Sequence, residues 1–231
     1  MNIRANRIKS GWSVKLHLHS CLKEGRGILL SHRTLLKICP EYSNIIGHMC
    51  YAASKLWNIC NYERRHYKEL GLEKYPDWYY QKKAHKGDLW YRQLPSQTAQ
   101  ETCKQLDKAW KSFYVLKKTG GIEEPNPPRF KQDNIPVTYM QMGIRHEKGS
   151  DQLRLSLAKD LKSYMEETYG IHEKFLYLEN KIFRKMDCIK QLRIYPPKNE
   201  KCDLLSFMRL KSRNGFLRMD IIYRLIWDFI I

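Results

Sequence analysis

The stretch that decides the fold is Ser43-Asn-Ile-Ile-Gly-His-Met-Cys-Tyr-Ala-Ala-Ser-Lys-Leu-Trp-Asn-Ile-Cys60. Its apolar residues recur every three or four positions, at Ile45, Ile46, Met49, Cys50, Ala53, Leu56, Trp57 and Cys60. This period predicts one face of an amphipathic helix, which we expect to run to about Leu70 and to end at Gly71. The other face carries Lys55, Asn58, Arg64, Arg65 and Lys68.

Two further helices are predicted downstream. Asp77 is the expected N-cap of the first, which carries Trp78, Tyr79, Tyr80, Lys82 and Lys83 and ends at Gly87. Ser96 is the expected N-cap of the second, which ends at Gly120-Gly121. The apolar stripe of this second helix consists of Ala99, Cys103, Leu106, Trp110 and Phe113. The chain thus contains a helical block.

Short strand-like segments flank that block. Alternating residues predict a strand at 14–19, and further strands at 137–143, 153–157, 174–178, 189–195 and 216–223. Segments 31–39 and 161–169 are expected to be short helices, whereas the prolines of 123–131 exclude one there. We therefore predict an α+β fold in which a helical block is inserted into a β barrel. Residues 1–42 would hold the first barrel strand and its lead-in, 43–120 the inserted bundle, and 121–231 the rest of the barrel and an apolar tail.

Charge and cysteine content narrow the class of protein. The net charge of +18, beside a hydrophobic fraction of 42%, favours a folded protein with a polyanionic partner such as nucleic acid. The alternative is a soluble protein from a lineage whose proteins are generally basic. No apolar run is long enough to span a membrane, and the N-terminus does not read as a signal peptide. The seven cysteines form no C-x-x-C pair, which indicates reduced thiols and a cytoplasmic location.

Basic and aromatic residues alternate most densely in Asn61-Tyr-Glu-Arg-Arg-His-Tyr-Lys68 and in Trp78-Tyr-Tyr-Gln-Lys-Lys83. Cationic side chains neutralise phosphates, and flat rings stack on bases. The alternative is that Trp57, Trp78 and Trp110 anchor the core while the lysines only solvate the surface. Pro127-Pro-Arg-Phe-Lys131 is a second candidate contact segment, because paired prolines stiffen the loop that presents Arg129 and Lys131.

The sequence contains no evident group of catalytic residues. Acidic residues are scattered rather than grouped as metal-dependent nuclease chemistry requires. His17 and His19 share one strand face without an evident third ligand. Nucleotide-binding glycine loops and the G-x-S-x-G motif are missing. We expect no catalytic residue, no metal ligand and no cofactor.

Five motifs carry a resemblance to a known family. They are Lys55-Leu-Trp-Asn58 with Asn61-Tyr62, Leu94-Pro-Ser-Gln-Thr-Ala-Gln100, Leu106-Asp-Lys-Ala-Trp-Lys111, Pro127-Pro-Arg-Phe-Lys131 and Ile189-Lys-Gln-Leu-Arg-Ile194. In order and spacing they resemble the N-terminal half of TnpB, the OrfB-type protein of insertion sequences that is related to compact type V CRISPR effectors. The resemblance covers about residues 43–223. It implies a wedge-like β barrel with an inserted helical recognition bundle that holds guide RNA and target DNA.

The chain departs from that family where the nuclease half would follow. A RuvC-like fold with its metal-binding carboxylates and a zinc ribbon would come next, but this sequence ends at Ile231. The segment 225–231 is interpreted as unrelated residues added by a frameshift or early stop. The resemblance therefore implies a truncated TnpB-like protein that binds RNA and DNA without nuclease activity.

Three alternatives stay open. The first is a nuclease-dead, RNA-guided repressor of DNA. The second is a transposase or endonuclease fragment that is active only with a separately encoded RuvC half, and the third is an enzyme that acts alone. Residues and resemblance together predict nucleic-acid contacts at Lys55, Asn58, Asn61, Tyr62, Arg64, Arg65, Tyr79, Lys82, Lys83, Ser96, Gln97, Gln100, Lys104, Lys111, Arg129 and Lys131.

Overall fold

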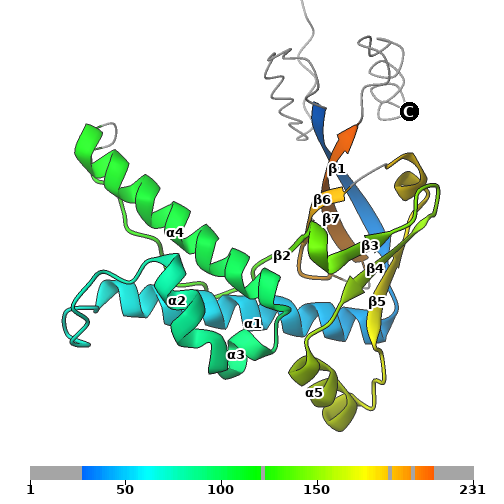
Figure 1. Ribbon diagram of the computed structural model, residues 1–231, viewed down its shortest axis with the longest axis horizontal. Coiled ribbons are helices and arrows are strands. Elements are labelled where there is room, and N and C mark those ends of the chain that lie inside the picture. The colour runs from blue at the N-terminus through cyan, green and yellow to red at the C-terminus, as the bar shows by residue number, and fades with distance from the viewer. Residues whose placement is uncertain (1–27, 121–122, 187–188, 199–200, 211–231) are drawn as a thin grey trace, which may run out of the picture.

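The computed structural model describes residues 28–120, 123–186, 189–198 and 201–210. Four helices lie in the first half of the described chain: α1 (Pro40–Arg65), α2 (Trp78–Ala84), α3 (Leu89–Arg92) and α4 (Ser96–Thr119), with a 3-10 turn η1 at His85–Gly87. A fifth, α5 (Lys159–Tyr169), lies among the later strands. In Figure 1, α2, α3 and α4 gather along one end of α1, and the strands lie at its other end.

The predicted helices form, with altered ends. Pro40 occupies the first turn of α1, and the helix stops at Arg65 because the chain turns through 66–72, where Gly71 has a φ of +70°. The predicted cap of α2 is confirmed, since Asp77 accepts a hydrogen bond from the Tyr80 amide at 2.8 Å. The predicted cap of α4 is wrong: Pro95 holds the N-cap position, and the helix begins at Ser96.

In the described part of the chain, seven strands form two antiparallel sheets. In the first, β1 (Ile28–Lys37), β7 (Lys201–Leu210), β6 (Ile189–Ile194) and β2 (Val137–Met140) follow one another in that order. In the second, β4 (Gln152–Ser156) lies between β3 (Ile144–His146) and β5 (Phe175–Glu179). A short 3-10 turn, η2 (Gln141–Gly143), joins β2 to β3, and η3 (Lys181–Lys185) follows β5.

One expectation about the first sheet is wrong. The segment 31–39, expected to be helical, lies mostly in β1, which pairs with β7 over its whole length. This pairing supplies hydrogen bonds that a short local helix cannot match, and Pro40 starts a helix instead of ending one. β7 was not predicted, and the expected strands at 14–19 and 216–223 lie outside the described residues, as do His17, His19 and the segment 225–231.

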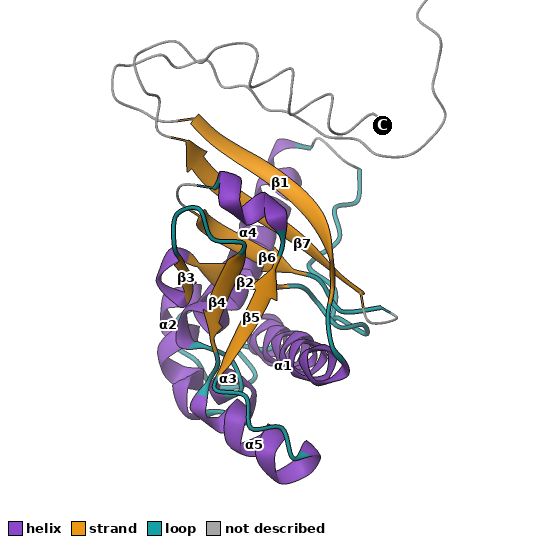
Figure 2. Cartoon of the chain, turned by 90° about the vertical axis from the view of Figure 1, so that its right-hand side faces the viewer, coloured by secondary structure: helices purple, strands orange, loops and turns teal. Residues whose placement is uncertain are grey.

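A single hydrophobic core joins the helices to both sheets. It includes Leu56 of α1, Leu106 of α4, Tyr139 of β2 and Leu155 of β4, all almost completely buried. The Tyr139 hydroxyl donates a hydrogen bond to the Ser156 carbonyl at 3.0 Å and so ties the two sheets together. Figure 2 looks nearly along α1 and shows the strands on one side of it and α5 on the other. The chain is a mixed α+β protein, and its described strands do not close into a barrel.

Candidate nucleic-acid interface

The loop 127–131 lies against α1 and is held there by side chains that bind its main chain. The Asn58 amide makes two such bonds, donating to the Lys131 carbonyl at 2.8 Å and accepting from the Lys131 amide at 2.7 Å. About two turns further along α1, Arg65 donates to the Pro128 carbonyl at 2.7 Å. These side chains therefore pair main-chain groups of a loop that lies outside the helices and strands.

Two buried tryptophans complete this attachment. The Trp57 indole donates to the Arg129 carbonyl at 3.2 Å. Asn61 lies beneath the loop, where it donates to the Pro128 carbonyl at 2.9 Å and accepts from the Trp110 indole at 2.9 Å. The interpretation of Trp57 and Trp110 as core anchors is confirmed, since they are 7% and 5% exposed. The loop is therefore joined to α1 directly and to α4 through Asn61.

The attached loop presents its own side chains to solvent. Arg129, Phe130 and Lys131 are all exposed. The Arg65 guanidinium lies 5.0 Å from the centre of the Phe130 ring, and the Lys131 ammonium lies 4.9 Å from that of Trp57. We call Arg65, Arg129, Phe130 and Lys131 the loop face. It combines three cations with an exposed aromatic ring, which suits a phosphate backbone with unpaired bases.

A second group of cations and rings lies where α2 meets α4. The Lys82 ammonium lies 4.1 Å from the ring centre of Tyr79 and 4.7 Å from that of Trp78. Lys104 of α4 also lies 4.7 Å from the Trp78 ring, and Lys83 lies 4.7 Å from that of Tyr79. We call these five residues the tryptophan–lysine cluster. Tyr79 is about half exposed, so its ring is accessible to a ligand.

Two predicted contact residues are inside the protein. Asn61 is fully buried, and Arg64 is 2% exposed. The Arg64 guanidinium donates to Asp107 at 3.0 Å and to the Gln81 side chain at 2.9 Å. Both residues therefore position helices and are withdrawn as direct contacts. Asn61 and Arg64 follow Trp57 by four and seven residues, which places them on the same face of the helix. This spacing is the sequence signal that could have predicted their burial.

A partly buried polar group that the sequence did not indicate holds η1 against α1. His85 lies between two carboxylates, 3.2 Å from Glu63 through Nε2 and 2.6 Å from Asp88 through Nδ1. Burial lowers the pKa of His85, but the hydrogen bonds to Glu63 and Asp88 outweigh it and raise the pKa to about 9. Burial raises the pKa of Glu63, and the bonds from His85 and Gln81 more than reverse this. Since both ring nitrogens are engaged, the imidazole serves structure.

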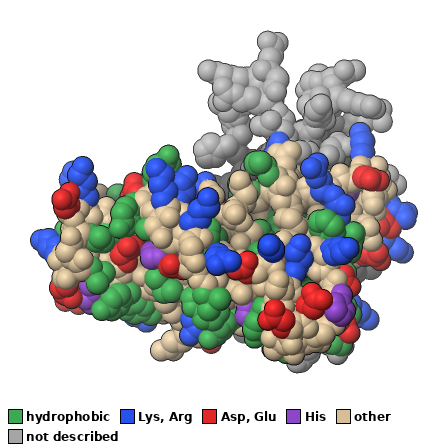
Figure 3. Space-filling view, turned by 60° about the horizontal axis from the view of Figure 1, so that its bottom comes forward, with side chains coloured by type: hydrophobic (Ala, Val, Ile, Leu, Met, Phe, Trp, Pro, Cys, Tyr) green, Lys and Arg blue, Asp and Glu red, His purple; other side chains and the backbone are tan. Residues whose placement is uncertain are grey.

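The other predicted residues do not converge on one site. Lys55 lies over the Tyr51 ring at 4.9 Å, and Lys111 pairs with Asp107 at 2.7 Å. Tyr62 is exposed and stacks on the His66 ring at 4.2 Å, one helical turn from both Asn58 and Arg65. At the start of α4, Ser96 is exposed, and Gln97 and Gln100 are partly buried. In Figure 3, lysine and arginine side chains form an interrupted row across the face shown, with acidic and apolar side chains among them.

The described residues contain no group of three or more histidines, cysteines and carboxylates placed to hold a metal ion. Cys60 and Cys103 lie side by side in the core with their sulfurs 3.9 Å apart, both as free thiols. In the same part of the chain, none of the helices is long and apolar enough to cross a membrane. Comparison of the chain with protein-family models and with curated proteins gives no match.

Proposed function

We propose that this chain binds nucleic acid through the loop face and the tryptophan–lysine cluster, as the non-catalytic half of a TnpB-like protein. The observation that carries the proposal is the meeting of three motifs far apart in sequence. Asn58 and Asn61 of the first motif bind the main chain of 127–131, and Trp110 of a third motif donates to Asn61. These contacts join the three motifs into one packed unit, as the proposed recognition bundle would require.

The chemistry of the loop face supports a polyanionic ligand. Its main chain is already held by hydrogen bonds, so little conformational entropy is lost when Arg129 and Lys131 meet phosphates. The net charge of +18 adds a long-range attraction and counterion release on binding. Aromatic rings beside the cations offer stacking surfaces for unpaired bases.

The proposal also covers the roles of the domains, the ligands and the lack of nuclease activity. The two sheets would belong to a wedge-like barrel, and the helices of 43–120 would be its recognition bundle. The ligands would be a guide-type RNA and DNA, bound in the cytoplasm. The chain would act without nuclease activity of its own, and any cutting would need a separately encoded nuclease half.

Titration of the purified chain with single-stranded RNA, a structured RNA and duplex DNA, at two salt concentrations, tests the proposal. The double variant Arg129→Gln/Lys131→Gln is compared with Lys159→Gln/Lys174→Gln, which removes the same charge from exposed positions at the start of α5 and directly before β5. We expect the loop variant alone to weaken binding and to reduce the slope of log K against log salt by about 1.4 to 1.8.

Absence of binding at low salt, or binding that does not respond to salt, would refute the proposal. Sequencing of the RNA that co-purifies from the native host distinguishes a guided repressor from a fragment that binds RNA without a guide. One dedicated RNA species would support guided repression, and a random sample of RNA would count against it. Incubation with labelled DNA and Mg²⁺ or Mn²⁺ tests the expected lack of nuclease activity, and cutting that persists through stringent purification would contradict it.

A further inference from the structure

The second sheet has an outer face that the proposed interface does not use. Register places Arg145 of β3 opposite Arg154 of β4, and Arg154 opposite Tyr177 of β5. The same face carries Phe175, opposite Ser156. Neighbouring residues point the other way into the core, where Leu153, Leu155, Leu176 and Leu178 are buried. Cations and rings therefore form a row across three strands, roughly 10 Å long at the usual strand spacing.

Arg145 and Arg154 bring two like charges directly opposite each other. Like charges directly opposite on adjacent strands destabilise a sheet. Within the described residues neither Arg145 nor Arg154 forms an ion pair, and both are exposed. The Glu179 carboxylate on this face accepts a hydrogen bond from Gln152 at 2.9 Å instead. An anionic ligand would relieve the repulsion between the arginines.

Aromatic rings lie beside these cations. The Arg154 guanidinium lies 4.6 Å from the centre of the Phe175 ring. The Phe175 and Tyr177 rings lie 6.3 Å apart with an interplanar angle of 71°. Both residues are only partly buried. The face thus offers a charged group for a phosphate and ring surfaces for bases within one short row.

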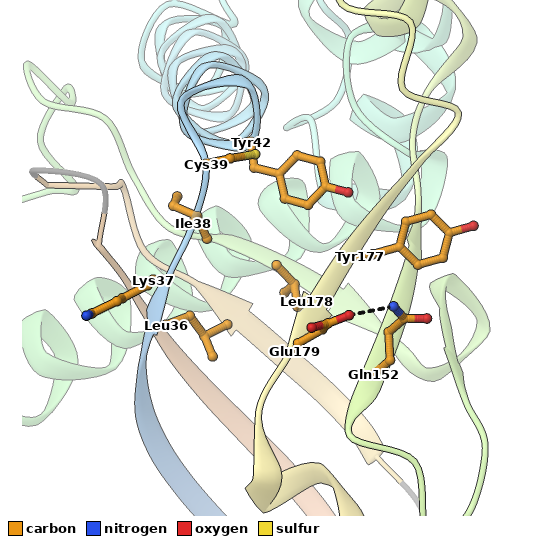
Figure 4. A pocket seen from close by; sticks show the side chains of 9 residues that line it. All are labelled: Leu36, Lys37, Ile38, Cys39, Tyr42, Gln152, Tyr177, Leu178 and Glu179. Carbon is orange, nitrogen blue, oxygen red and sulfur yellow. Dashed lines mark hydrogen bonds between the residues drawn. The ribbon is translucent and has the colours of Figure 1, made fainter.

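The row continues into an open hollow of about 420 Å³ between β5 and the start of α1. Figure 4 shows Tyr177 beside Tyr42, with Lys37 on the far side of the hollow and the Gln152–Glu179 bond at its edge. Tyr42 and Tyr177 both line this hollow. Ring surfaces and a further cation therefore extend the row beyond the sheet.

We propose that this outer face binds a single-stranded segment of nucleic acid, with phosphates on Arg145 and Arg154 and bases against Phe175 and Tyr177. The inference rests on the proposed function and adds a second contact surface to it. A single strand fits better than a duplex, because only unpaired bases expose the ring faces that stack on aromatic side chains.

The test uses the full chain, labelled oligouridylate and oligothymidylate of 12 nucleotides, and a mixed-sequence duplex DNA. Arg145→Gln/Arg154→Gln is compared with Lys117→Gln/Lys118→Gln, which removes equal charge from exposed lysines in the last turn of α4. We expect the arginine variant to bind the single strands at least five-fold more weakly than the control, with a salt slope smaller by about 1.4. Tyr177→Leu should weaken single-strand binding about five-fold or more without changing the slope. Duplex affinity should match the control.

Thermal unfolding keeps the comparison interpretable. Removal of opposed like charges should leave the arginine variant at least as stable as the wild type, so weaker binding would not reflect unfolding. Single-strand affinities equal to those of the control, or equal losses for duplex and single strand, would overturn the inference and leave the loop face untouched. A wild-type chain that binds none of the probes at low salt would instead overturn the proposed function and this inference with it.

Discussion

The charge on His85 should stabilise the helical block in a way that pH reveals. The ordinary pKa of histidine is 6.5, and Glu63 and Asp88 raise that of His85 to about 9 in the folded chain. A raised pKa stabilises the fold fully below pH 6.5, and the contribution disappears as pH rises through 9. The difference between the two values corresponds to at most about 3 kcal/mol.

Two features of the structure adjust that figure. The His85 side chain is only 12% exposed, so solvent screens its pairing with Glu63 little, but Asp88 is 42% exposed and contributes less. The lowered pKa of Glu63 reports the same ion pair, so it is not added. We therefore expect about 2 kcal/mol of unfolding free energy to be lost between pH 6 and pH 9.5 on account of this histidine.

Urea unfolding of the wild type and of His85→Gln at both pH values isolates this contribution. The wild type should lose about 2 kcal/mol more than the variant over this range, because glutamine does not titrate. His172→Gln is the matched control, since His172 pairs with Glu166 at the same 3.2 Å but is 73% exposed. Equal pH dependence in the wild type and in His85→Gln would refute the reasoning.

Two further predictions concern buried polar contacts. Asn61→Ala should lower the unfolding free energy in urea by about 2 to 4 kcal/mol, because it removes two hydrogen bonds and leaves the buried Trp110 indole N–H unpaired; a cost no larger than that of Asn58→Ala, at the exposed edge of the loop, would contradict this. Asp107→Asn should cost about 3 to 5 kcal/mol, since it leaves the buried Arg64 guanidinium without a counter-charge. Although burial raises the pKa of Asp107, bonds from Lys111 and Arg64 lower it overall. The wild type should thus lose this stabilisation as pH falls below about 4, and Asp107→Asn should not. If wild type and variant lost the same unfolding free energy over this pH range, the result would count against the ion pair.

Local patterns predicted the helices well because their causes are local. The apolar period of α1, the Asp77 cap and the left-handed Gly120 at the end of α4 each act within a few residues. The strand β1 was mistaken for a helix because its conformation depends on pairing with β7, near the other end of the described chain. Strand pairing between distant segments can override the local secondary-structure propensity of a short segment.

The candidate interface was predicted in part for the same reason. Asn58, Arg65 and Lys131 were named separately, but their contacts depend on how the loop packs on α1. Arg64 was assigned to the surface because a charged side chain is almost never buried without a partner, and its partner Asp107 comes from another helix. The arginine pair of the second sheet needed the register of β3 with β4, and β3 is too short to be recognised from alternation.

The bonds that hold the loop 127–131 end on its main-chain atoms. Trp57, Asn58, Asn61 and Arg65 all donate to main-chain carbonyls, which every residue type provides. Asn58 also accepts from the Lys131 amide, a group that every residue type except proline provides. The side chains at Arg129 and Lys131 can therefore be exchanged while the attachment stays intact. Substitutions at Arg129 and Lys131 can thus change the affinity and selectivity of this surface without changing how the loop is attached. The same loop conformation could therefore present side chains suited to different ligands.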